Sequence, residues 1–370
     1  MKIVFILKES LNRCPPALST VKHLLALGHE LLVIATGIQE DTRQELEQGH
    51  CRCMDLSLDS PLSSLPKIGK VFQWKSFQSQ VLAVLKKENF DLLWLGSADA
   101  TLAVGTALFR YRYVLQILEL YDMFPFYRNR LGEYMRRAEK VLVPEEVRAH
   151  IFRAWYQLKE TPVVLPNKPF GHPRKRNLPI TDPRAAEAFA KIPGDARILF
   201  YQGQIYKDRD LRPLARAVQN MDGKIVFAVQ GKIFNDDYCK DFFKNYNPYY
   251  IPFVPAPHHL EVTSNVHIGL LTYKHNQENN EFCAPNKIWE YTGFGLPLLG
   301  NDVYGLKRDF EAYNIGIPVN FDSNDPKPIR EALEALLNRE EEFAANAARF
   351  FSSVDNAAII AKILKNFAEK

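Results

Sequence analysis

Residues 197–229, RILFYQGQIYKDRDLRPLARAVQNMDGKIVFAV, hold the pattern that decides the fold. Residues 197–201 form a short apolar run that predicts a buried strand, and residues 211–218 place apolar side chains at helical spacing. Residues 224–229 form a second apolar run that predicts the next strand. A strand, a helix and a strand in this order are typical of a parallel sheet covered by helices.

The same alternation extends through both halves of the chain. In the first half it predicts strands at residues 3–7, 30–35, 92–95, 113–118, 141–143 and 163–165, with a helix at 17–27. In the second half it predicts further strands at residues 250–254, 267–271 and 297–300, with helices at 287–293, 328–337 and 356–367. The predicted fold class is therefore α/β, with two Rossmann-like doubly wound parallel-sheet domains that face each other across a cleft.

The 370-residue length favours two domains, and a proline-rich segment separates them. This segment carries a basic cluster and five prolines, at Pro169, Pro173, Pro179, Pro183 and Pro193. We therefore expect a first domain at 1–168, a linker at 169–195 with a short helix at 185–190, and a second domain at 196–350. A C-terminal helix at 351–370 is expected to pack back toward the first domain.

Composition narrows the function classes. Hydrophobic residues make up 46% of the chain, as in a globular protein with a full core, and the net charge is +4. This charge is too low for a dedicated nucleic-acid binder and suits an enzyme of anionic small molecules or a protein on an anionic membrane surface. Five scattered cysteines favour a reducing cytoplasm, and no stretch approaches the length of a membrane span.

Residues 280–297, NEFCAPNKIWEYTGFGLP, predict a loop that runs into a helix near Pro285. The free N–H groups of the first helical turn lie at the carboxyl edge of the sheet, which favours an anion such as a diphosphate. Lys287 and Glu290 are three residues apart and share a face. An ionised Glu290 offers two acceptor oxygens to a pair of ribose hydroxyls. The alternative is a surface Lys–Glu pair that supports the helix.

The stretch 285–297, PNKIWEYTGFGLP, resembles the donor-binding signature of GT-B glycosyltransferases of the retaining family 4 type, also called glycosyl transferases group 1. The resemblance implies a GT-B fold, transfer of a sugar with retention, and no metal or other cofactor. The residues expected to bind the nucleotide-sugar donor are Ala284, Pro285, Asn286, Lys287 and Glu290, with Glu290 on the ribose. Glu281 lies one residue from the position where many members carry a second acid, and is a candidate catalytic residue.

A second loop, residues 201–211, supports this assignment. Gly203 lets the backbone approach a ligand closely, and Lys207 and Arg209 follow at the carboxyl edge of the sheet. A guanidinium suits phosphate oxygens, and Arg209 matches the basic position that contacts the pyrophosphate in the resembling family. Asp208 and Asp210 also spell a metal motif of a different glycosyltransferase fold, although Asp210 is well placed to cap the next helix.

The first half offers weaker candidates for the acceptor side. Glu119 and Asp122 follow a predicted strand and are candidate catalytic residues, or else loop and capping residues. An aromatic and basic region fits either solvated helix faces or contact with anionic lipid headgroups or a lipid-linked acceptor: Arg110, Tyr111, Arg112, Tyr113, Tyr127, Arg128, Arg130, Arg136 and Arg137.

The resemblance therefore predicts a glycosyltransferase, and the scattered cysteines place it in the cytoplasm, at the inner face of the membrane in one alternative. Its partners would be a UDP- or GDP-sugar and a glycan, lipid-linked saccharide or small-molecule acceptor, in bacterial surface polysaccharide or glycoconjugate synthesis. Two rivals remain open. The chain could be a nucleotide-sugar epimerase or phosphorylase on the same fold, or a non-catalytic sugar-nucleotide-binding subunit.

Overall fold

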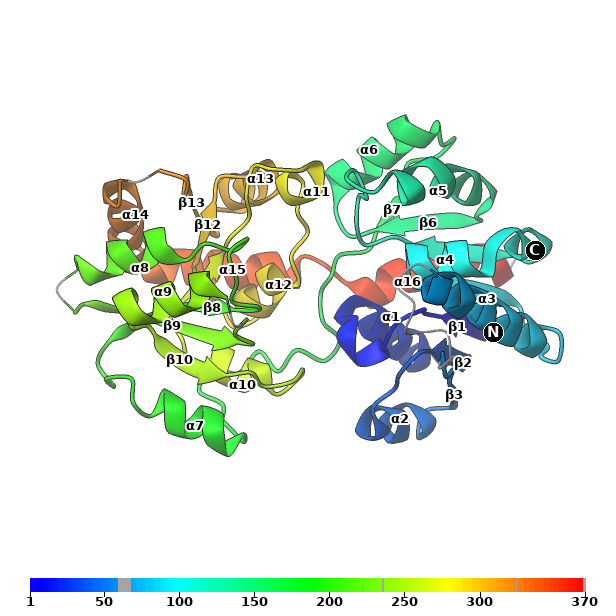
Figure 1. Cartoon of the computed structure of the whole chain (residues 1–370), viewed down its shortest axis with the longest axis horizontal. Helices are drawn as coiled ribbons and strands as arrows, with labels where there is room; N and C mark the ends of the chain where they lie inside the picture. The colour runs from blue at the N-terminus through cyan, green and yellow to red at the C-terminus, as the bar shows by residue number, and fades with distance from the viewer. Residues whose placement is uncertain (59–67, 222, 235, 324, 369–370) are drawn as a thin grey trace. The chain divides into compact units, whose positions relative to one another are not determined.

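A computed structural model describes residues 1–58, 68–221, 223–234, 236–323 and 325–368. These residues divide into two compact units, Met1–Phe170 with the segment from Asp355 onward, and Gly171–Val354. Each unit contains one sheet with helices on both faces (Figure 1). The α/β class expected from the alternation of strands and helices is confirmed.

The first unit is built on a sheet with the strand order β3-β2-β1-β4-β5-β6-β7 in its described residues, and neighbouring strands are parallel. Its strands are β1 Lys2–Ile6, β2 Glu30–Ala35, β3 Cys51–Asp55, β4 Leu92–Leu95, β5 Tyr113–Gln116, β6 Lys140–Val143 and β7 Val163–Val164. Its helices are α1 Pro15–Ala26, α2 Glu40–Glu47, α3 Ile68–Leu85, α4 Ala98–Val104, α5 Pro125–Arg137, α6 Glu146–Tyr156 and α16 Asn356–Ala368.

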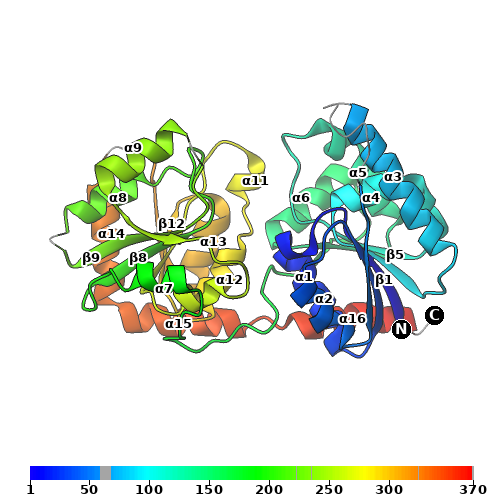
Figure 2. The same ribbon diagram turned by 60° about the horizontal axis from the view of Figure 1, so that its bottom comes forward.

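The C-terminal helix α16 belongs to the first unit. Its apolar residues Ile360, Ile363 and Leu364 are buried in the same core as Val21 and Leu24 of α1. Figure 2 shows α1 and α16 on one face of the first sheet and α3, α4 and α5 on the other. The apolar stripe of α16 explains why the chain returns to this sheet after the second unit.

The second unit is built on a sheet with the order β10-β9-β8-β11-β12-β13 in its described residues, again with parallel neighbours. Its strands are β8 Arg197–Gln202, β9 Ile225–Gly231, β10 Tyr249–Pro252, β11 Ile268–Leu271, β12 Leu298–Asn301 and β13 Gly316–Val319. Its helices are α7 Pro183–Phe189, α8 Arg212–Gln219, α9 Asp237–Tyr246, α10 His259–Thr263, α11 Glu278–Glu281, α12 Asn286–Thr292, α13 Tyr304–Tyr313, α14 Lys327–Asn338 and α15 Glu340–Ser352.

Two apolar cores enclose the second sheet because successive side chains of its strands point to opposite faces. Phe200 of β8 lies in the core shared with α12 and α15, and Tyr201 lies in the core shared with α8, α9 and α14. Residues 171–195 of the segment expected as a linker, 169–195, fall within this unit. Its helix α7 packs on β10, and Asp182 accepts hydrogen bonds of 3.0 Å from the N–H groups of Arg184 and Ala185.

None of the described helices is both long enough and apolar enough to cross a bilayer.

Candidate nucleotide-sugar site

Two loops flank the point at which the strand order of the second sheet reverses. β8 and β11 are neighbours in the sheet, although two strands separate them in the sequence. Residues 203–211 follow β8, and residues 272–285 follow β11. Ligands of open α/β sheets bind at the carboxyl ends of the strands beside such a reversal. The topology therefore brings the two motifs singled out in the sequence to one place.

Two glycines set the start of the first loop. Gly203 and Gly231 have φ of +142° and +152°, and a Cβ on Gly231 would lie 1.7 Å from the carbonyl oxygen of Gly203. The N–H of Gly203 donates to Gln230 O at 2.9 Å, and the N–H of Ile205 donates to Lys232 O at 3.0 Å. The loop therefore lies directly against the end of β9, and only glycine fits such a close approach.

Lys287 and Arg209 bring two positive charges together beside Gly203. The Nζ of Lys287 lies 4.4 Å from the ring centroid of Tyr201, and 3.0 Å from where a Cβ on Gly203 would be. The Nη1 of Arg209 donates to Thr272 O at 2.7 Å, and its guanidinium lies 4.1 Å from the Tyr273 ring. Burial and the positive charge of Arg209 lower the pKa of Lys287 to about 7. The site therefore favours an anion.

Glu290 follows Lys287 by three residues on α12 and is 8% exposed. Its Oε2 accepts a hydrogen bond from the Nε2 of Gln202, and its Oε1 lies 3.4 Å from the Nε2 of His259. Gln202 in turn accepts a 2.6 Å hydrogen bond from Thr263. Burial acts to raise the pKa of Glu290, but His259 and Lys287 outweigh it, so the pKa is lowered. The carboxylate is charged and fixed in place.

His172 fixes the backbone of α12. Its Nε2 lies 3.0 Å from Glu290 O, and its ring packs 4.3 Å from that of Phe294. Burial lowers the pKa of His172 to about 4, so the neutral ring donates its Nε2–H to this carbonyl. Gly293 leaves room for the imidazole, because a Cβ there would lie 2.5 Å from it.

Replacement of Glu290 by alanine is expected to weaken both stability and ligand binding. It leaves Gln202 without its carboxylate partner, which costs about 1–3 kcal/mol. Loss of a charged hydrogen bond to ribose predicts about a 10- to 150-fold weaker nucleotide affinity. Urea denaturation without ligand and titration calorimetry with nucleotide measure the two effects. Unchanged nucleotide affinity in a folded variant would contradict the ribose role.

The remaining predicted donor residues lie on the same two loops. Pro285 is the N-cap of α12 and Asn286 its first residue, with Ala284 just before them. The side chain of Lys207 is exposed, and its charge acts on Asp236 at the start of α9. Glu281 ends α11, and its carboxylate accepts from His275 and from the N–H of Tyr304.

Asp210 serves the backbone. Its Oδ1 accepts the Arg212 N–H at 3.1 Å at the start of α8, and its carboxylate binds the Arg212 guanidinium at 2.8–2.9 Å. The prediction that Asp210 caps this helix is wrong, because α8 begins at Arg212 and its N-cap is Leu211, one residue after Asp210.

The two first-half candidates lie at the carboxyl edge of the first sheet. Glu119 is half-exposed and 3.7 Å from the Nη1 of the buried Arg148, and Asp122 is partly buried. Two further carboxylates escaped the sequence analysis. Glu9 follows β1 and Asp99 lies in the first turn of α4, and burial together with the charge of Asp99 raises the pKa of Glu9. Both residues follow strands that are neighbours in the sheet, β1 and β4, and this position could have identified them from the sequence.

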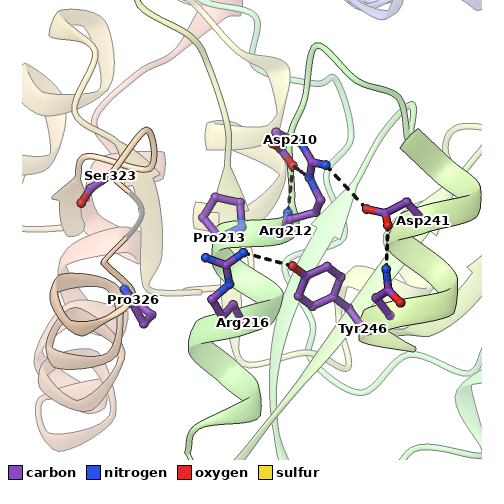
Figure 3. Close-up of a pocket in the computed structure, with 9 residues that line it drawn as sticks. Asp210, Arg212, Pro213, Arg216, Asp241, Tyr246, Ser323 and Pro326 are labelled. Atoms are coloured by element: carbon purple, nitrogen blue, oxygen red, sulfur yellow. Dashed lines mark hydrogen bonds and ion pairs between the residues drawn. The ribbon is translucent and has the colours of Figure 1, made fainter. Parts of the chain in front are cut away.

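A separate pocket of about 320 Å³ lies between α8, α9 and the segment before α14 (Figure 3). Arg212 is paired there with Asp210 and lies 3.6 Å from Asp241, while Arg216 donates to the Tyr246 hydroxyl at 3.3 Å. Carboxylates balance this pocket, so it lacks the excess positive charge found beside Gly203.

The two doubly wound parallel sheets define the GT-B fold, the two-domain fold of many glycosyltransferases. The fold expected from the family resemblance is thus confirmed. HepE from Anabaena, solved in complex with UDP-glucose, is similar over 100% of both chains, with a TM-score of 0.72 and 15% identity. Sucrose-phosphate synthase from Thermosynechococcus elongatus has a TM-score of 0.73 and 14% identity over 100% of both chains.

A structure from Listeria monocytogenes described as a UDP-N-acetylglucosamine 2-epimerase is similar as well. Its TM-score is 0.67 at 14% identity, over 100% of this chain and 97% of the other. No protein-family model and no curated protein matches the sequence.

Proposed function

We propose that the protein is a glycosyltransferase that takes a sugar from a UDP- or GDP-sugar held by the second unit. The observation that carries this proposal is the pairing of Lys287 and Arg209 beside Gly203, with the buried Glu290 one helical turn further along α12. A diphosphate would neutralise the two cations, and the carboxylate would accept from the ribose hydroxyls. A nucleotide-sugar donor would thus use all three groups at once.

In this proposal Arg209 supplies the electrostatic part of catalysis. As the bond between sugar and phosphate breaks, negative charge grows on the leaving diphosphate. The guanidinium is already held by Thr272 O and the Tyr273 ring, so it needs no reorganisation. The family resemblance adds retention at the anomeric carbon and a reaction without metal or other cofactor. Positive side chains would then take the place of a metal ion.

The similar structures support the donor class and include an example of one rival, the epimerase. The HepE complex holds UDP-glucose, whereas the Listeria monocytogenes structure is described as an epimerase of UDP-N-acetylglucosamine. An epimerase would change the sugar nucleotide without an acceptor, and a transferase would leave it intact until an acceptor is added.

An exposed apolar cluster supports an acceptor at a membrane surface. Its members on α3 and before or within α5 are 43–62% exposed: Val71, Phe72, Met123, Phe124 and Phe126. Trp74 joins the two helices through a 5.7 Å ring contact with Phe126. With the nearby Arg128 and Arg130, this surface suits anionic lipid or a lipid-linked saccharide. We propose that the protein is cytoplasmic, lies at the inner face of the membrane, and acts in surface polysaccharide or glycoconjugate synthesis.

A ligand panel tests the proposed function. Thermal shift with UDP-, GDP-, ADP- and CMP-sugars should show a stabilising nucleotide sugar, and EDTA should not remove the effect. Incubation of that sugar nucleotide without acceptor should return it unchanged. An epimerised product would favour the rival enzyme, and absence of stabilisation by any nucleotide would contradict the donor site.

Donor binding is expected to take up a proton above neutral pH. The pKa of Lys287 is about 7 in the free protein, and a bound diphosphate favours the charged ammonium and so raises this pKa. At pH 8 the free amine is mostly neutral, so binding should take up close to one proton, and donor affinity should fall as pH rises above about 7. Calorimetry of UDP-glucose in buffers of different ionisation enthalpy measures this uptake. Uptake that persists in Lys287→Gln would assign the proton to another group.

A further inference from the structure

His275 lies between two carboxylates on different segments of the second unit. Its Nδ1 is 2.8 Å from Oε2 of Glu281, and its Nε2 is 2.8 Å from Oδ1 of Asp302. Both ring nitrogens face acceptor oxygens, and only the protonated imidazolium can donate from both at once. The geometry therefore describes a charged histidine that joins α11 to the turn before α13.

Further contacts seat the same segment on α13. The second oxygen of Glu281 accepts the Tyr304 N–H at 2.9 Å, and the rings of Phe282 and Tyr304 are 5.8 Å apart. A Cβ on Gly305 would lie 2.8 Å from the carbonyl oxygen of Cys283, so glycine is required for this approach. Residues 281–283, immediately before the donor-binding residues of α12, are thus attached to α13 through Glu281.

The residues before His275 contact the loop after β8, residues 203–211. Thr272 O holds the guanidinium of Arg209, and the Nζ of Lys274 donates to Lys207 O at 3.1 Å. His275 therefore stands where the loop after β8, the loop after β11 and the turn after β12 meet. A change at this side chain reaches both donor-binding loops.

We propose that His275 is a positioning residue that, as an imidazolium, holds the donor-binding loop 272–286 in its binding conformation by joining Glu281 to Asp302. This role rests on the proposed donor site. It also assigns the Glu281 carboxylate to the loop anchor, with both of its oxygens already occupied.

The anchor is expected to depend on pH. Asp302 and Glu281, the charged groups that face the ring, raise the pKa of His275, whereas the neighbouring Lys274 ammonium is directed to Lys207 O. Because folding raises the pKa of His275, its contribution to the stability of the loop is complete below the ordinary histidine pKa. This contribution is lost as pH rises through the raised pKa. The loop should therefore loosen in mildly alkaline solution.

Hydrogen exchange without any nucleotide tests the anchor. At pH 6, amides of 278–284 and 286 in His275→Gln should exchange about 5- to 25-fold faster than in the wild type, since each partly exposed pair contributes up to about fivefold. The difference, corrected for intrinsic rates, should become smaller at high pH, where the neutral ring can donate from only one nitrogen. His258→Gln is the matched control, because His258 pairs with Glu261 at 2.8 Å in the same unit, and neither residue belongs to segment 272–286.

A parallel titration with UDP-glucose separates the two proposals. His275→Gln should bind the donor more weakly than the wild type at pH 6, and this difference in affinity should become smaller at high pH. Equal exchange in variant and wild type at pH 6, or unchanged donor affinity in the variant, would overturn the role of His275. If amide exchange in the loop depends on pH as expected but the wild type binds no nucleotide, the donor site would be overturned instead.

Discussion

Replacing Arg209 by alanine is expected to lower kcat by about 100- to 1000-fold, as does loss of one preorganised donor to a developing negative charge. The guanidinium contributes most where the diphosphate leaves, so the donor dissociation constant should change less than kcat. Arg209 is only partly buried, and its fixed contacts are Thr272 O and the Tyr273 ring. The melting temperature should therefore change little.

Arg209→Lys provides the graded control. Lysine keeps the charge but loses the planar fork, so it should restore only part of kcat. Steady-state kinetics beside a melting curve makes the comparison. Normal kcat in Arg209→Ala, or a variant that unfolds, would show that this arginine is a structural charge.

Replacing Gly231 by alanine is expected to destabilise the second unit by about 4 kcal/mol or more, the range of severe steric lesions. The new Cβ would lie 1.7 Å from Gly203 O, which is backbone and cannot rotate away, and φ at this position is +152°. To accept the methyl group, β8 and β9 must separate at the end where the loop 203–211 begins.

Gly223→Ala isolates the clash from the backbone conformation. Gly223 also has positive φ, at +76°, but a Cβ there would meet no atom within 4 Å. It should cost only about 1–2 kcal/mol, the penalty of a left-handed residue. Native-state hydrogen exchange of β8 and β9 amides measures both variants. Equal losses in the two would contradict the close approach of Gly203 and Gly231.

The sequence predicted the strands wherever burial left an apolar run. β2 and β4 have the predicted bounds, because both faces of a parallel strand are covered. Two strands went unpredicted. β3, CRCMD, is an edge strand with charged residues, and β13, GIPV, is short and contains a proline. Edge strands tolerate polar residues and proline, so hydrophobicity does not reveal them.

The site was predictable only for residues within the two motifs. Gly203, Arg209, Lys287 and Glu290 come together because β8 and β11 are neighbours. The contacts that hold the carboxylate were not predictable, since Gln202 and His259 are 88 and 31 positions away from Glu290.

The most direct test of the donor site compares Lys287→Gln with Arg216→Gln by calorimetry, using the nucleotide sugar that stabilises the wild type. Both variants lose one basic side chain from the second unit, Lys287 beside Gly203 and Arg216 from the pocket of Figure 3. We predict about a 10- to 150-fold loss of affinity in Lys287→Gln and wild-type affinity in Arg216→Gln. Wild-type affinity in Lys287→Gln, with the loss in Arg216→Gln, would contradict a donor site at the ends of β8 and β11.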